Sequence, residues 1–254
     1  MPPRFLVLDI EAVRDERVWT PPADNPDAFA PPHAWQPIVI GFVLLEQPAA
    51  FGAFRVRKVG AIEAPPDATV DERERIILER FETGFHGNAP TVVTWNGRRF
   101  DLPVLLLRSL RYGIPHGWYY DSRDHRYRYS EAGHCDLADA MADYGASSAL
   151  GLDGMAKLIG LPGKFGTIDG AGVGAAFAAG RHEEIKRYCV SDAIQTAFLW
   201  LRWGLLKGEL APDEYRASAA ALLVACEQHG GLADFVARVD RRVLLLEDPA
   251  KEGA

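Results

Sequence analysis

Two acidic side chains stand at the end of the first apolar run of the chain. Asp9 and Glu11 follow residues 4–8, which are typical of a buried strand. Because side chains alternate along a strand, Asp9 and Glu11 project from the same face. An apolar core does not tolerate two like charges without compensation, and carboxylate oxygens are the ligands that hard divalent cations prefer. The pair therefore predicts a cation site to which other parts of the chain contribute.

Two further acids are candidates for that site. Asp101 follows an apolar strand at 90–95 and the loop 96–100, and open α/β sheets bind ligands at such strand ends. Asp192 lies in the apolar stripe of a helix predicted over 182–206, where an unpartnered carboxylate is costly. The alternative interpretations are a helix cap for Asp101 and an ion pair with a buried arginine for Asp192.

Four clustered carboxylates would repel one another unless cations neutralised them or some stayed protonated. Two Mg²⁺ or Mn²⁺ ions about 3.5–4 Å apart would resolve this and would stabilise the attacking and leaving oxygens of a phosphodiester displacement. Tyr188 lies one helical turn before Asp192, so its hydroxyl could orient the attacking water or share its proton. The alternative for Tyr188 is a core tyrosine with a satisfied hydroxyl.

Three motifs together resemble a known family. They are Asp9-Ile-Glu11, Trp95-Asn-Gly-Arg-Arg-Phe-Asp101 and Tyr188-Cys-Val-Ser-Asp192. In this combination the chain resembles the DEDD-type 3′–5′ exonucleases with tyrosine in the third motif (DEDDy), of the RNase H-like superfamily. It is similar to the proofreading exonuclease domain of family B DNA polymerases. The resemblance covers about residues 4–205, and we expect a stand-alone exonuclease without a polymerase domain.

The resemblance implies a role for each metal-binding carboxylate. Asp9 would bridge both ions, and Glu11 and Asp192 would hold the ion that activates water. Asp101 would support the second ion, often through water. Two Mg²⁺ or Mn²⁺ ions are therefore the expected cofactors.

The same resemblance implies roles for three other residues. Tyr188 would position the nucleophile, Asn96 would hydrogen-bond the terminal nucleotide, and Phe100 would pack on its base or sugar. The expected reaction is hydrolysis at the 3′ end of single-stranded DNA, the expected partner, with release of nucleoside monophosphates. The alternatives are a 3′–5′ exoribonuclease and a non-catalytic nucleic-acid-binding module, and the complete acid set argues against the latter.

The fold class expected from this pattern is α/β: an RNase H-like mixed sheet flanked by helices, with a helical C-terminal extension. We predict a catalytic domain over 1–208 and an extension over 209–254 that packs on it. The predicted strands are 4–11, 38–45, 51–58 and 90–95, the first three as an antiparallel meander. The predicted helices are 71–85, 102–112, 152–159, 182–206, 212–229 and 232–246, with a long loop at 12–37 and a linker at 166–174.

Two intermediate segments have less specific signals. Residues 117–130 interleave tyrosines with arginines, which indicates either an ordinary exposed loop or hairpin, or a surface that stacks bases and pairs phosphates. The segment 134–139 resembles a stretch that the family carries between its second and third motifs and is predicted to start a short helix. There we expect Asp136 to be an N-cap, and His134 to support the site from behind or to lie at the surface.

Composition bounds the class of protein. The net charge of −7 argues against general adhesion to nucleic acid, although neutralising four site carboxylates would leave about −3. Three scattered cysteines exclude a disulfide framework or a zinc cluster built from them and fit a reducing compartment. The N-terminal apolar run is too short for a signal peptide, and no run approaches the ~20 residues of a membrane span. We expect a soluble, cytoplasmic protein.

Overall fold

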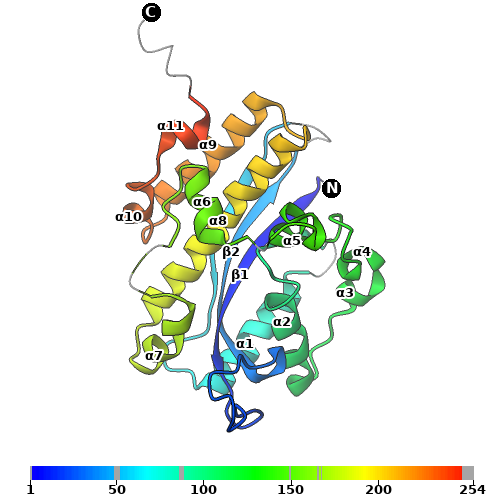
Figure 1. The fold of residues 1–254 in the computed structure, drawn as a ribbon, viewed down its shortest axis with the longest axis vertical. Coiled ribbons are helices and arrows are strands. Elements are labelled where there is room, and N and C mark those ends of the chain that lie inside the picture. The colour runs from blue at the N-terminus through cyan, green and yellow to red at the C-terminus, as the bar shows by residue number, and fades with distance from the viewer. Residues whose placement is uncertain are drawn as a thin grey trace, which may run out of the picture.

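A mixed sheet forms the centre of the computed structural model, which describes residues 2–48, 52–85, 89–148, 150–164, 166 and 168–247. Its five strands in that range have the order β3-β2-β1-β4-β5. Figure 1 shows β1 and β2 between α8 on one side and α1 and α2 on the other. Strands β1 (Arg4–Arg14), β2 (Trp35–Glu46) and β3 (Arg55–Ile62) are an antiparallel meander, as predicted. Strands β4 (Thr91–Thr94) and β5 (His134–Asp136) continue the sheet parallel to β1.

Long helices cover both faces of the sheet. Helices α1 (Val70–Thr83) and α2 (Asp101–Ser109) pack on one face, and α8 (His182–Leu206) and α9 (Pro212–Gln228) pack on the other. The shorter helices are α3 (Gly117–Asp121), α4 (Arg123–Arg126), α5 (Leu137–Met141), α6 (Leu152–Leu158), α7 (Val173–Ala178), α10 (Ala233–Val236) and α11 (Arg241–Leu245). This arrangement confirms the predicted RNase H-like α/β class.

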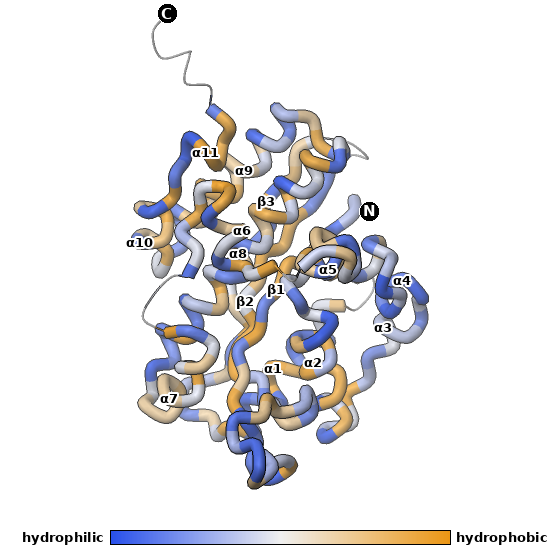
Figure 2. Tube along the Cα trace, viewed as in Figure 1, coloured by the Kyte–Doolittle hydropathy of each residue, from blue (hydrophilic) through white to orange (hydrophobic). Residues whose placement is uncertain are grey.

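The alternation of β1 decides which way the acids point. Leu8 and Ile10 are buried in the core beneath α1 and α2, whereas Val7 is buried in the core beneath α8. Because side chains on a strand alternate between faces, Asp9 and Glu11 project from the α8 side. Figure 2 shows the apolar colouring concentrated where strands and long helices meet.

The bounds of several elements differ from the sequence-based prediction. The loop predicted at 12–37 is shorter, because β1 runs on to Arg14 and β2 starts at Trp35, with a bulge after Glu11 that keeps the two strands paired. The third strand lies at 55–62 instead of 51–58, and residue 51 is outside the described residues. Within the predicted linker 166–174, a 3₁₀ turn (Gly170–Gly172) leads into α7.

Local capping explains three further corrections. The segment 117–130 holds α3 and α4, and Ser122 caps α4 through its side chain. The segment 134–139 begins as strand β5, and Asp136 then caps α5, as predicted for that aspartate. The predicted last helix 232–246 is interrupted, since Asp240 starts α11 with a new cap.

Helices α9, α10 and α11 share the apolar core of α8. The Tyr215 hydroxyl donates to the Leu244 carbonyl, and the backbone N–H of Phe54, next to β3, donates to Ser218 on α9. The division at residue 208 stays a prediction. None of the described helices combines the length and apolar character needed to cross a bilayer.

A buried charge network ties the start of the loop after β1 to α1 and α2. Arg108 on α2 pairs with Glu74 on α1 and with Asp15, and all three side chains are almost fully buried. Arg17 and Arg108 lower the pKa of Asp15 to about 2. The network therefore holds the start of this loop against α1 and α2.

We expect Arg108→Met to lower the free energy of unfolding by about 3–5 kcal/mol, because it leaves the buried Glu74 carboxylate without its cation and leaves Asp15 with Arg17 alone. Urea unfolding measures this change. Arg111→Met is the matched control, since Arg111 pairs with Asp71 at the surface and should cost at most about 1 kcal/mol. Equal losses in the two variants would contradict a structural role for the buried network.

Candidate active site

Asp9 and Glu11 lie in the second half of β1, opposite Gly41 and Val39 of β2. Glu11 exposes 9% of its surface, and the bulge that follows it redirects the strand. The Oδ2 atom of Asp9 is buried without a hydrogen-bond partner in the described part of the chain. A buried polar atom without a partner is costly, which marks Asp9 as a position where a further group is expected.

Asp101 is the first residue of α2, and Phe100 holds the N-cap position without a side-chain cap bond. Its carboxylate accepts a hydrogen bond from the backbone N–H of Ile10 (3.2 Å) and therefore touches β1 between Asp9 and Glu11. The structure thus joins the second motif to the first, and Asp101 is not the cap of its helix.

Asp192 reaches the same place from α8 because of a close contact between that helix and the sheet. A Cβ built on Gly41, the partner of Asp9, would meet the Cys189 carbonyl oxygen at 2.5 Å. In addition, the Gly41 N–H donates to the Cys189 sulfur (3.0 Å), and the Cys189 thiol donates to the Asp9 carbonyl (3.2 Å). Only glycine permits this approach, which brings the face of α8 that carries Asp192 onto β1.

Asp192 has polar partners but no ion pair among the residues that the structure describes. Gln195 donates to its Oδ1 atom (3.2 Å), and a hydrogen bond from Tyr188 opposes the rise in its pKa. The alternative interpretation, an acid paired with a buried arginine, is therefore not what these contacts show.

All four acids have raised pKa values, and the charges of the other acids contribute to the rise at Asp9 and Glu11. Burial, and then the charges of Asp101, Glu11 and Asp192, raise the pKa of Asp9 well above its usual range. Burial, Asp192 and Asp101 do the same for Glu11. Burial is also the main cause that raises the pKa of Asp101 and that of Asp192 to about 7. The acids are thus near enough to disfavour one another's ionisation.

The donor set suits hard divalent cations, although it is not a closed coordination shell. Among the described residues, no three or more His, Cys, Asp or Glu side chains are already arranged to hold a metal ion. What fits the cation is the chemistry: carboxylate oxygens from three elements, repulsion between them, and the unpartnered Oδ2 of Asp9.

Tyr188 lies half-buried on α8, one turn before Asp192. Burial is the largest cause that raises the pKa of its hydroxyl above the usual value, followed by the charges of Asp192, Glu11 and Asp9. A bound cation would offset the effect of the acids on this pKa but not the effect of burial. The hydroxyl therefore stays protonated near neutral pH, which favours orienting water over sharing its proton.

The two predicted nucleotide-binding residues lie at opposite ends of the loop between β4 and α2. Asn96 is exposed at φ 61°, a left-handed conformation that asparagine tolerates better than most residues. The Phe100 ring lies 5.8 Å from the Trp35 ring and 5.8 Å from the Phe29 ring, between centroids. Phe29 is 74% exposed although it is held in this cluster, and an exposed aromatic platform is a candidate for base stacking.

Sequence reasoning missed Phe29 as a candidate site residue. It belongs to the loop after β1, and the Trp35 indole N–H donates to the Ala30 carbonyl beside it (2.9 Å). The available signal was an aromatic residue in a segment rich in proline and aspartate. The loop after β1 therefore reaches Phe100.

Asp136 has a second role beyond capping α5. Its carboxylate accepts hydrogen bonds from the backbone N–H groups of Asn96 and Arg98, both at 2.9 Å, and so holds the loop that leads to Asp101. His134 is fully buried and shares a hydrogen bond with Thr94 (2.8 Å). Of the two positions expected for it, the one at the surface is therefore wrong.

Comparison with solved structures shows what this fold is similar to. The fold is similar to that of the family B DNA polymerase from the hyperthermophilic archaeon Pyrobaculum calidifontis, with a TM-score of 0.52 at 16% identity. The match covers 96% of this chain and 27% of the polymerase chain. At this identity the match establishes the fold.

A family model then identifies the group. Residues 27–238 match the model described as a predicted 3′–5′ exonuclease related to the exonuclease domain of PolB, and the chain belongs to that family. The matched range contains Asp101, Tyr188 and Asp192, whereas Asp9 and Glu11 precede it. No curated protein matches the chain.

We expect Tyr188→Phe to slow hydrolysis by about 100-fold, because the attacking water would lose one orienting hydrogen bond, and misplacing a reacting group costs on this scale. Binding of the single strand should change by less than about twofold. Single-turnover hydrolysis and fluorescence anisotropy separate the two effects. Tyr129→Phe, at an exposed tyrosine, is the matched control. A Tyr188→Phe rate equal to that of the control would remove this hydroxyl from the mechanism.

Proposed function

We propose that this chain is a divalent-metal-dependent 3′–5′ exonuclease that hydrolyses single-stranded DNA from its 3′ end and releases nucleoside monophosphates. The observation that carries the proposal is the meeting of Asp9, Glu11, Asp101 and Asp192, from β1, α2 and α8, where the charges of Asp101 and Asp192 raise the pKa values of Asp9 and Glu11. Membership of a family of predicted 3′–5′ exonucleases supports the same reaction.

Mg²⁺ or Mn²⁺, when bound, would supply Lewis-acid stabilisation of the displaced oxygens and a lower pKa for the attacking water. Asp9, Glu11, Asp101 and Asp192 would hold the ions through their carboxylate oxygens. The raised pKa values imply that cation binding displaces protons near neutral pH.

The remaining residues would position the substrate and the water. The protonated Tyr188 hydroxyl would hold the attacking water in line with the terminal phosphodiester. Phe100, with Phe29 beside it, would stack on the terminal nucleotide, and Asn96 would hydrogen-bond it. Stacking accepts any base, so we expect little sequence preference.

The alternatives make different predictions. An exoribonuclease would prefer a substrate with 2′-hydroxyl groups, which a protein can use to distinguish RNA from DNA. A non-catalytic nucleic-acid-binding module would bind a strand without shortening it. A cytoplasmic location remains a prediction from cysteine usage.

The test uses DNA and RNA 20-mers carrying a 3′-terminal label, with Mg²⁺, Mn²⁺ or EDTA. The proposal predicts early release of labelled mononucleotide from DNA with either metal and none with EDTA. Circular single-stranded DNA, which has no end, should remain intact. Faster hydrolysis of RNA would favour the exoribonuclease. Cleavage of the circle, or binding without hydrolysis under every condition, would contradict an exonuclease.

A further inference from the structure

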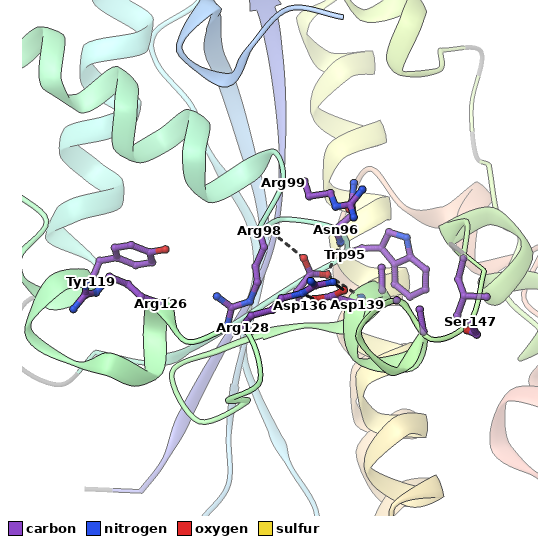
Figure 3. A pocket seen from close by; sticks show the side chains of 14 residues that line it. Trp95, Asn96, Arg98, Arg99, Tyr119, Arg126, Arg128, Asp136, Asp139 and Ser147 are labelled. Carbon is purple, nitrogen blue, oxygen red and sulfur yellow. Dashed lines mark hydrogen bonds and ion pairs between the residues drawn. The ribbon is translucent and has the colours of Figure 1, made fainter.

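A cavity of about 800 Å³ lies beside the candidate active site (Figure 3). Its walls come from the loop after β4, from α3 and α4, and from α5 and the turn that follows α5. Four arginines line it, against two aspartates, in a chain whose net charge is −7. The charged and aromatic side chains in its lining include Arg99, Arg126, Arg128, Asp136, Asp139 and Tyr119.

Both carboxylates in the cavity are already satisfied by the protein. Asp139 receives two hydrogen bonds of 2.6 Å from Arg128, and Asp136 receives the two backbone N–H groups of the β4–α2 loop. Neither aspartate pairs with Arg99 or Arg126. The surplus positive charge is therefore available to a ligand.

Arg99 and Arg126 present the available guanidinium groups. Arg99 is exposed, and within the described part of the chain its guanidinium forms no hydrogen bond or ion pair. Its backbone N–H donates to the Asn96 carbonyl (3.2 Å), and its charge helps to lower the pKa of Asp139. Arg126 makes a long hydrogen bond of 3.4 Å to the Tyr120 carbonyl and lies over the Tyr120 ring. Guanidinium groups bind phosphate through paired hydrogen bonds, so both are suited to a phosphate-bearing ligand.

Aromatic rings accompany these cations. Tyr119 and Trp95 line the cavity, and Figure 3 shows Tyr119 beside Arg126 at one end and Trp95 beside Asn96 at the other. Cations that follow a backbone, interleaved with rings on which bases stack, are the usual composition of a single-strand site. Part of the aromatic and basic segment 117–130 therefore lines this cavity.

The sheet places this cavity next to the acids. Val7 of β1 is level with Val93 of β4, and Thr94 is level with Asp136 of β5. Asp136 therefore lies two strands away from β1 at nearly the level of Asp9, about 10 Å by the spacing of strands. Asn96 lies between the cavity and Asp101 along the chain: it lines the cavity and belongs to the loop that ends at Asp101.

We propose that this cavity binds the substrate strand upstream of the terminal phosphodiester, with Arg99 and Arg126 on its phosphates and Tyr119 against a base. The inference rests on the proposed exonuclease function for the direction of the strand, but the binding itself does not require hydrolysis. A free mononucleotide offers the same phosphate chemistry. The position of the cavity at the loop that ends at Asp101, and its formation from three separate segments, favour a strand.

The test compares Arg99→Gln/Arg126→Gln with Arg55→Gln/Arg57→Gln, which removes two positive charges from β3 at the opposite edge of the sheet. Anisotropy of a labelled DNA 15-mer in EDTA measures binding without hydrolysis. The cavity variant should weaken binding about tenfold and reduce the magnitude of the slope of log K against log[salt] by about 1.4, the value for two single-strand phosphates. The β3 variant should match the parent.

Two further measurements separate the outcomes. Titration with dAMP tests the other source of phosphate: a loss of dAMP affinity in the cavity variant, with 15-mer binding unchanged, would overturn the proposal. With Mg²⁺, the ratio of kcat/KM for the 15-mer to that for a dinucleotide should fall about tenfold in the cavity variant. If no substrate is hydrolysed, the exonuclease proposal fails while the anisotropy result still decides the cavity. Equal 15-mer affinity and salt slope in both double variants would refute the site.

Discussion

Asp192→Asn is expected to lower the rate of DNA hydrolysis by about three powers of ten or more, with Asp9→Asn at least as severe. Each change removes a charged ligand where the transition state depends on several kcal/mol of cation stabilisation, and 1.36 kcal/mol is tenfold in rate. Single-turnover hydrolysis with saturating Mg²⁺ measures the effect. Asp213→Asn, at a carboxylate with 88% of its side chain exposed, is the matched control.

The same substitution should not destabilise the metal-free protein, which separates a functional acid from a structural one. The folded-state pKa of Asp192 is raised to about 7, so the folded protein holds a proton that the unfolded chain releases near pH 4. The stability from this group is therefore complete below pH 4 and is lost as pH rises towards 7.

Asp192→Asn removes that pH dependence. In EDTA, we expect the variant to gain stability relative to the parent between pH 4 and pH 7, as measured by urea unfolding. Mg²⁺ should reverse the order at pH 7, because only the parent has its full set of carboxylates. A variant that retains parental activity, or that loses stability at pH 7 in EDTA, would contradict the assignment of Asp192 to a cation site.

Gly41→Ala is expected to reduce hydrolysis by about 100-fold although Gly41 provides no functional group. The added Cβ would lie 2.5 Å from the Cys189 carbonyl oxygen, and the backbone of α8 cannot yield as a flexible side chain can. The helix must move away from β1, and a displacement of about 1 Å is enough to cost 100-fold in rate. Overpacking should also lower the free energy of unfolding by about 1–3 kcal/mol.

Gly60→Ala is the control for this prediction. Gly60 lies on β3 next to β2, and a Cβ there would have no neighbour closer than the Lys58 side chain at 3.7 Å. We expect its hydrolysis rate and stability to equal or slightly exceed those of the parent, since alanine is less costly than glycine in a strand. If Gly41→Ala behaved like Gly60→Ala in hydrolysis and unfolding, the close approach of α8 would not be what positions Asp192.

The central strands, the long helix and the four acids could be predicted because each leaves a local signal. A carboxylate in an apolar run is such a signal at Asp9, and the helical apolar stripe around Asp192 is another. The bounds of the loop after β1 were missed because the bulge after Glu11, and not local composition, extends the pairing of β1 with β2. Tertiary contact overrode the local preference for a turn.

Other features of the site arise only from contacts between distant segments. The hydrogen bonds from Asn96 and Arg98 to Asp136 form across two strands, and no spacing in the sequence predicts them. The contact of Phe29 with Phe100 depends on how the loop after β1 folds back. Gly41 is one of 24 glycines, and only the packing of α8 distinguishes it.

The most direct measurement of the central claim is X-ray diffraction from crystals soaked in Mn²⁺, with anomalous maps used to locate the ion. We expect at least one anomalous peak within about 2.0–2.6 Å of a carboxylate oxygen of Asp9. A carboxylate oxygen of Asp192 or Asp101 should lie within the same distance of that peak. The peak should be absent in crystals of Asp9→Asn soaked in the same way. Mn²⁺ peaks confined to other surfaces of the protein, with no peak at Asp9, would contradict it.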